Sequence, residues 1–156
     1  MLTATPYITK MFEYIATDVQ TRTGIPIHYA HGTRKNIDDE LVAFENSDNS
    51  DHKFPAIFLI QPFTEKVPDD VKIESDLNLK LVIATRTDPN YSPDNREANS
   101  FVPVLRPIYI SLMDSIKNSG YFVTAYGRIK HDHTDLYEWG EAGSSVFCDY
   151  VDVIFI

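Results

Sequence analysis

The sequence predicts an α+β domain in which an antiparallel or mixed sheet of about four to five strands packs against two main helices. Residues 73–85 alternate apolar and polar side chains, which is typical of a strand with one face in the core and one in water. Residues 54–60 are apolar throughout, as in a strand shielded on both faces. Residues 61–71 between them are too polar for a core and too short for a crossover helix, so the two strands should form an antiparallel hairpin.

The first helix is expected just after the start of the sequence and should cover the hairpin. Thr5 can cap it, Pro6 suits its first turn, and Gly24 ends it. Its apolar positions fall on one stripe, which consists of Ile8, Met11, Phe12, Ile15 and Val19. This stripe is interpreted as a core face, with a partner-binding helix as the less favoured alternative.

The second helix is expected over residues 101–116 and should stop at Gly120. Its helically spaced apolar residues are Phe101, Leu105, Ile108, Tyr109, Leu112 and Ile116. Pro103 and Pro107 each remove an amide donor and crowd the carbonyl four residues back. The helix should therefore be kinked, or become regular only near one of the two prolines.

Three further strands complete the expected sheet. Residues 25–30 contain Pro26, which places them at a sheet edge or a strand start. Residues 121–126 and 146–156 are rich in strand-forming side chains, and the latter should tie the C-terminal part into the sheet. Phe147, Val151, Val153 and Phe155 should share one face of that last strand.

Three polar stretches are expected to be loops. Residues 31–53 include a run of Asn, Asp and Ser that cannot order itself by burial, so a mobile loop is predicted, with one or two helical turns at 38–44 as an option. Residues 86–96 and 130–145 are the other two. Within the last, the exposed aromatic segment 135–141 is either a lid on the core or an anchor for a partner.

Composition limits the classes of function. A chain of 156 residues is expected to be one domain, 1–156, and its formal charge of −9 argues against a surface that grips nucleic acid. Cys148 is the sole cysteine, so neither an internal disulfide nor a thiol-based metal site is expected, and a buried thiol is favoured. A leader and a membrane-spanning run are not recognisable, so a cytoplasmic protein without membrane contact is predicted.

Catalytic and cofactor signatures are weak. His131 and His133 have a spacing that puts both imidazoles on one face of a strand, as do some metal sites, although a solvated loop is the simpler interpretation. His28 and His31 are also close in sequence. Ser144 and its neighbours lack the glycine of a nucleophile elbow, and no glycine-rich phosphate loop occurs. No cofactor, no metal and no enzymatic activity are therefore expected.

The order of elements carries a resemblance to a known family. A helix, a strand, a polar insertion, the aromatic-proline strand at 54–59, the alternating strand at 77–83, a long helix and two closing strands resemble the tail terminator, or tail completion, proteins of tailed phages. The resemblance covers most of the chain. The two prolines of the second helix and the long loops at 31–53 and 130–145 depart from the simplest pattern of that family.

This resemblance implies an α+β subunit, a minor tail protein, that closes into a ring, commonly a hexamer, at the head-proximal end of the tail tube. Its partners would be copies of itself, the tail tube protein and a neck or connector protein, with DNA only as passing cargo. Assembly would take place in the host cytoplasm, and the protein would then reside in the tail or neck of the virion. The candidate contact or lumen residues are Arg86, Asp88, Tyr91, Arg96, His131, His133, Tyr137, Trp139 and Glu141.

Two other classes of function compete with this interpretation. The first is a small metal-dependent or hydrolytic enzyme that uses the region of His131 and His133. The second is a monomeric adaptor that binds a peptide along an open sheet edge. Oligomeric state separates the ring subunit from the adaptor, and metal analysis separates it from the enzyme.

Overall fold

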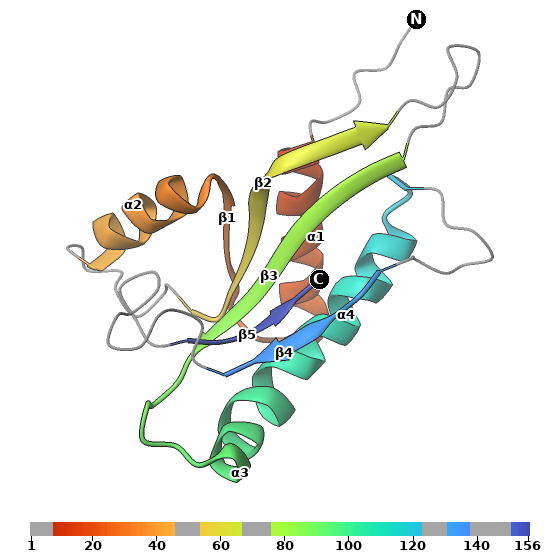
Figure 1. Ribbon diagram of the computed structural model, residues 1–156. Coiled ribbons are helices and arrows are strands. Elements are labelled where there is room, and N and C mark those ends of the chain that lie inside the picture. Colours follow the sequence, from red (N-terminus) through yellow and green to blue (C-terminus); the bar gives the residue numbers. More distant parts are fainter. Residues whose placement is uncertain (1–7, 46–53, 67–75, 123–130, 138–150) are drawn as a thin grey trace, which may run out of the picture.

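The computed structural model describes residues 8–45, 54–66, 76–122, 131–137 and 151–156, and these residues form an α+β fold, as predicted (Figure 1). The elements in chain order are α1 (Ile8–Thr23), β1 (His28–Gly32), α2 (Arg34–Glu45), β2 (Ala56–Lys66), β3 (Asp76–Arg86), α3 (Pro93–Arg96), the π-helix η2 (Glu97–Leu105), α4 (Arg106–Asn118), β4 (Thr134–Leu136) and β5 (Val151–Phe155).

The described strands form one mixed, five-stranded sheet in the order β1-β2-β3-β5-β4. Strand β1 is parallel to β2, and the other neighbours are antiparallel. The predicted hairpin is confirmed, with Ile57 opposite Ile83 and Leu59 opposite Leu81. The prediction that the strand ends at residue 60 is wrong, because β2 continues to Lys66. A register shift after Ile60 lets the strand continue past a proline, as a bulge does.

The far half of the hairpin extends beyond the rest of the sheet. Strand β1 pairs with β2 only as far as Ile60, and the β5 side of the sheet reaches β3 only as far back as Leu81. Among the described residues, 64–66 and 76–78 therefore pair only with each other. Figure 1 shows β2 and β3 continuing together past the other strands. This portion, residues 61–66 and 76–80, is called the hairpin arm below.

Helices α1 and α4 pack together on one face of the sheet (Figure 1). The predicted stripe of α1 is confirmed as a core face: Met11, Phe12, Ile15 and Val19 are buried. The helix ends where expected, at Gly24, whose φ of 71° belongs to the left-handed region that favours glycine. The expected caps Thr5 and Pro6 lie outside the described residues.

Helix α2 covers part of the other face of the sheet. The prediction of a loop over 31–53 is therefore wrong for residues 31–32, which end β1, and for residues 34–45, whereas the optional helical turns at 38–44 lie within α2. Ile37 and Leu41, one helical turn apart, are fully buried against a core that includes Phe58 of β2. The start of the helix is fixed by a reciprocal cap. The backbone amide of Asn36 donates to Thr33 Oγ1 at 3.1 Å, and the backbone amide of Thr33 donates to Asn36 Oδ1 at 3.1 Å.

The second core changes the expected environment of β3. Leu81 and Ile83 face α1 and α4, whereas Val82 and Ala84 are buried in the core shared with α2. The expectation of one solvated face is therefore wrong for this half of the strand, because no helix was expected to pack on that face, where α2 lies. It holds at Asn78 and Lys80, in the hairpin arm, which are exposed.

The proline-containing helix is divided as predicted. Residues 97–105 form the π-helix η2 with Pro103 inside it, and a regular α-helix begins only at Arg106, with Pro107 in its first turn. A proline ring in an α-helix collides with the carbonyl four residues back, and the wider π turn relieves that collision. Helix α4 then ends at Asn118, followed by Gly120 with a φ of 77°.

The last part of the chain differs from the prediction in two places. Strand β5 confirms an ordered strand at 151–155, whereas residues 146–150, including Phe147 and Cys148, lie outside the described residues. Tyr121 and Phe122 are irregular, so the strand predicted to begin at residue 121 does not begin there. Strand β4 occupies part of the loop expected at 130–145, because its backbone pairs with β5.

Candidate functional site

Arg96 is buried at the junction of α3 and β5 and does not form the exposed contact that the sequence suggested. Its guanidinium donates to Asp152 Oδ1 at 2.8 Å and to Thr87 Oγ1 at 3.3 Å. The side chains of Arg96 and Asp152 are 6% and 0% exposed, so this ion pair belongs to the interior. The cation is instead used within the subunit, because a buried carboxylate on a core strand requires a partner.

The Arg96 guanidinium also holds the loop at 87–92. It approaches the backbone carbonyls of Asp88 and Pro89 at 3.4 and 3.5 Å. Asp88 Oδ1 accepts the amide of Asn90 at 2.9 Å, which is an Asx turn. The loop is therefore built around Arg96. Its outward residues include Asp88, which is exposed, and Tyr91, which is half-buried.

Arg86, at the end of β3, remains exposed, with its guanidinium 5.9 Å from the ring centre of Phe54. It lies at the opposite end of β3 from the hairpin arm. Of the nine residues proposed from the sequence, Trp139 and Glu141 lie outside the described residues.

His131 and His133 both lie next to the same residue of α4, Tyr109. The Tyr109 hydroxyl lies 2.6 Å from His131 Nε2 and 3.5 Å from His133 Nδ1. The ring of His133 is also close to that of Tyr109, with centroids 4.8 Å apart. Burial, with a contribution from the charge of Asp135, raises the pKa of Tyr109, so the phenol is protonated at neutral pH. The spacing of the two histidines predicted that they lie on one side of the segment, but the sequence did not predict that both contact Tyr109.

A second group of side chains ties β4 to η2. Arg106 forms a 2.6 Å ion pair with Glu97 and lies 3.6 Å from Asp135, while the Tyr137 hydroxyl donates to Glu97 at 3.2 Å. The hydrogen bond from Arg106 holds the pKa of Glu97 below its usual value. The surface between η2, α4 and β4, called the β4 surface below, consists of Glu97, Arg106, Tyr109, His131, His133, Asp135 and Tyr137.

A buried aromatic ring and a guanidinium group both contact the ring of Tyr137. Its ring packs edge-on against the buried Phe101, with centroids 5.4 Å apart, and lies 5.6 Å from the Arg96 guanidinium. The sequence left two roles open for segment 135–141, a lid on the core or an anchor for a partner. Tyr137 is in contact with the core while 39% exposed, so it has features of both.

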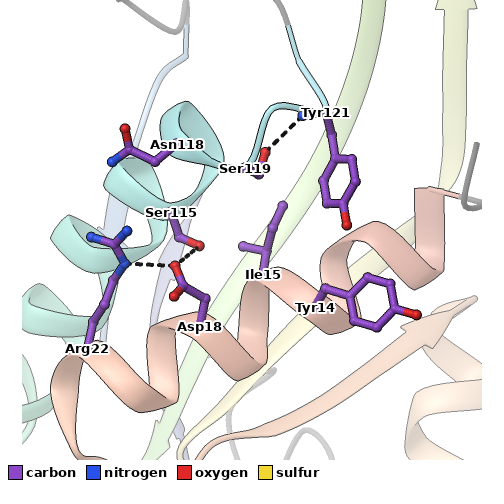
Figure 2. A pocket seen from close by; sticks show the side chains of 8 residues that line it. All are labelled: Tyr14, Ile15, Asp18, Arg22, Ser115, Asn118, Ser119 and Tyr121. Atoms are coloured by element: carbon purple, nitrogen blue, oxygen red, sulfur yellow. Dashed lines mark hydrogen bonds and ion pairs between the residues drawn. The ribbon is translucent and has the colours of Figure 1, made fainter.

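A hollow of about 250 Å³ lies between α1 and α4 (Figure 2). Figure 2 shows Tyr14 and Tyr121 at one end and Arg22 at the other. On its wall, Asp18 Oδ2 accepts hydrogen bonds from Ser115 Oγ and from Arg22 Nε, both at 2.7 Å. The hydrogen bond from Ser115 lowers the pKa of the Asp18 carboxyl group most, and the hydrogen bond from Arg22 lowers it further. Its charged groups are thus already paired with each other.

His28 and His31 of β1 do not converge. His28 is largely buried on the α2 side, with Nε2 3.4 Å from Glu40 Oε1, whereas His31 is exposed beside Tyr29. Burial lowers the pKa of His28, and the charge of Glu40 only partly opposes this. In the unfolded chain the same imidazole titrates at about 6.5.

The free energy of unfolding should therefore fall as pH drops below about 6.5, because the unfolded chain then binds a proton that folded His28 does not yet accept. Replacing His28 by glutamine should flatten this dependence, measured by urea unfolding between about pH 7.5 and 5.5. The matched change His31→Gln, at an exposed position, should leave it unaltered. Equal slopes in both variants and the parent would show that His28 is not the cause.

Within the described residues, no helix is long and apolar enough to cross a membrane. The same residues contain no group of three or more His, Cys, Asp or Glu side chains arranged to hold a metal ion. Comparison of the chain with protein-family models, curated proteins and solved structures gives no match in any of the three.

Proposed function

We propose that the chain is a structural subunit of a tailed-phage virion, a tail terminator or tail completion protein that forms a ring between the tail tube and the neck. The hairpin arm is the observation that carries this proposal. A two-stranded ribbon with no strand at either side is marginally stable in water by itself. A neighbouring subunit packed against the arm would supply the strand pairing that the described strands of its own sheet do not offer to residues 64–66 and 76–78.

The two ends of the described sheet also suit a ring. At one end β1 has a parallel neighbour, and at the other the short strand β4 has an antiparallel one. Contacts made through two unlike edges are heterologous, and heterologous contacts close into rings when the rotation between subunits allows it. A symmetric dimer would instead need one self-complementary patch.

The charges favour assembly over chemistry. Two ion pairs hold elements of the subunit in place: Arg106 with Glu97, and Arg96 with Asp152. The formal charge of −9 would weaken adhesion of DNA to a ring lumen, which suits a passage through which DNA travels. The tail tube protein and a neck protein would be the partners on the two faces of the ring.

Removing the hairpin arm should abolish ring formation without unfolding the subunit. In the test variant, Asn-Gly replaces residues 62–78, so that Gln61 and Leu79 are joined by a two-residue turn. Residues 56–60 and 81–84 of the two cores and the core-packed Leu79 are kept, and Phe63, which also packs against the core formed with α1 and α4, is removed. Light scattering after gel filtration should report a multimer for the parent and a monomer for the variant, with unchanged circular dichroism.

A matched control keeps the paired strands of the arm and removes only its tip. In that variant Asn-Gly replaces residues 67–75, between the paired residues Lys66 and Asp76. It should still form rings if the paired strands make the contact. Electron microscopy should then show parent rings at one end of tubes assembled from the tail tube protein. A parent that stays monomeric at high concentration and does not bind tube ends would exclude the proposal in favour of the adaptor.

A further inference from the structure

The phenolic oxygen of Tyr109 and two imidazole nitrogens converge at one point on the β4 surface. His131 Nε2 is 2.6 Å and His133 Nδ1 is 3.5 Å from that oxygen. We infer that Tyr109, His131 and His133 form a binding site for a divalent transition-metal ion, with Zn²⁺ and Cu²⁺ as the best-matched ions. This inference is independent of ring formation and assigns no catalytic role to the ion.

The two separations from the Tyr109 oxygen to the imidazole nitrogens are near those of donors that share an ion. Metal–nitrogen and metal–oxygen bonds of about 2.0–2.1 Å in a tetrahedral site place neighbouring donors about 3.3 Å apart. The observed separations of 2.6 and 3.5 Å lie on either side of that value. Small rotations of three side chains would therefore bring the donors to bonding positions, with water completing the coordination.

The backbone explains why these donors meet. In an extended segment, residues two apart point to the same side, so His131 and His133 both face α4. The break at Pro107 starts a new α-helix whose first turn presents Tyr109 to them. Residues 131–137 are exposed, so an ion can reach the site from solvent.

The surrounding charge favours a cation. Asp135 lies on the same side of the segment and its charge acts on Tyr109, with Arg106 at 3.6 Å offsetting part of it, and the chain carries a formal charge of −9. Imidazole ligands suit Cu²⁺ and Zn²⁺, and the usual order of affinities makes Cu²⁺ the tighter of the two. Tyr109 would coordinate as phenolate, with its proton released to solvent when the ion binds. A bound ion would link α4 to the segment that leads into β4, joining residues that are 22 positions apart in the sequence. It would therefore stiffen the β4 surface.

The test is titration of the full-length protein with Zn²⁺ and with Cu²⁺, followed by calorimetry. The parent should bind one ion per chain, and Tyr109→Phe, His131→Gln and His133→Gln should each weaken binding at least about tenfold. The control His31→Gln changes an exposed histidine on β1 and should bind as the parent does. A phenolate-to-copper charge-transfer band should appear in the visible spectrum of the parent and be absent in Tyr109→Phe.

Circular dichroism should confirm that the variants fold, because two of the three side chains are exposed. Zn²⁺ should also raise the thermal midpoint of the parent and of His31→Gln by more than it raises that of the three ligand variants. Absence of stoichiometric binding by the parent would overturn the inference. So would an affinity that is unchanged by Tyr109→Phe or by either histidine substitution, since each of the three ligands is required.

Discussion

Replacing Asp152 by alanine should lower the free energy of unfolding by about 3–5 kcal/mol, the cost of leaving a buried charge without its partner. Arg96 and Asp152 are 2.8 Å apart, and their side chains are 6% and 0% exposed. After the substitution the Arg96 guanidinium would remain in the interior opposite β5. Urea unfolding at neutral pH, followed by circular dichroism, would measure the loss.

Two comparisons make this result specific. Removing Glu97, whose pair with Arg106 is shorter but has side chains 35% and 42% exposed, should cost about 1 kcal/mol or less. The double change Arg96→Met with Asp152→Leu should be far less damaging than Asp152→Ala, because no unpaired charge then remains. An Asp152→Ala loss no greater than that of Glu97→Ala would contradict the assignment of a buried, structural ion pair.

The local part of the fold could be predicted because its signals are local. The apolar stripe of α1, the alternation in β3 and the glycines after α1 and α4 each depend on residues a few positions apart. The break before α4 was predictable for the same reason, since a proline acts on the carbonyl four residues back. Patterns of this kind identify elements reliably even when their ends shift by a few residues.

Helix α2 was predicted only as one or two optional turns at 38–44, because its polar surroundings outweighed a short signal. Ile37 and Leu41 are buried in it one turn apart, but the run of Asn, Asp and Ser that follows favoured a loop over 31–53. The Thr33 and Asn36 cap was the signal that could have revealed it. Asp152 within the apolar run at 151–155 was a comparable signal, because a carboxylate buried in a strand requires a cationic partner. The sequence does not identify Arg96 as that partner.

The candidate site was only half predictable. His131 and His133 were paired by their spacing, but Tyr109 lies 22 residues before His131 and joins them through the packing of β4 beside α4. Arg96 was expected on the surface for a similar reason. Its neighbours in sequence are polar, and the core that encloses it is assembled from distant strands.

Replacing Phe101 by alanine should lower the free energy of unfolding by about 3–5 kcal/mol, the range for loss of a large buried aromatic side chain. Phe101 is fully buried in η2, beneath Tyr137 and 5.6 Å from the Arg106 guanidinium. The π-helix is constrained by Pro103 and cannot easily close a cavity beneath it. Urea unfolding, compared directly with the parent, is the measurement.

The adjacent residue provides the control, because Val102 lies on the same π-helix but is 59% exposed. Val102→Ala should change stability by no more than about 0.5 kcal/mol, as surface substitutions usually do. Loss of Phe101 should also loosen the ring of Tyr137, since the Phe101 ring packs edge-on against it, whereas loss of the exposed Val102 side chain should not. The fluorescence quenching of tyrosine by added iodide should therefore increase in Phe101→Ala alone. Equal stability losses in the two variants would mean that the core beneath η2 repacks around the missing ring, and that the β4 surface does not depend on Phe101.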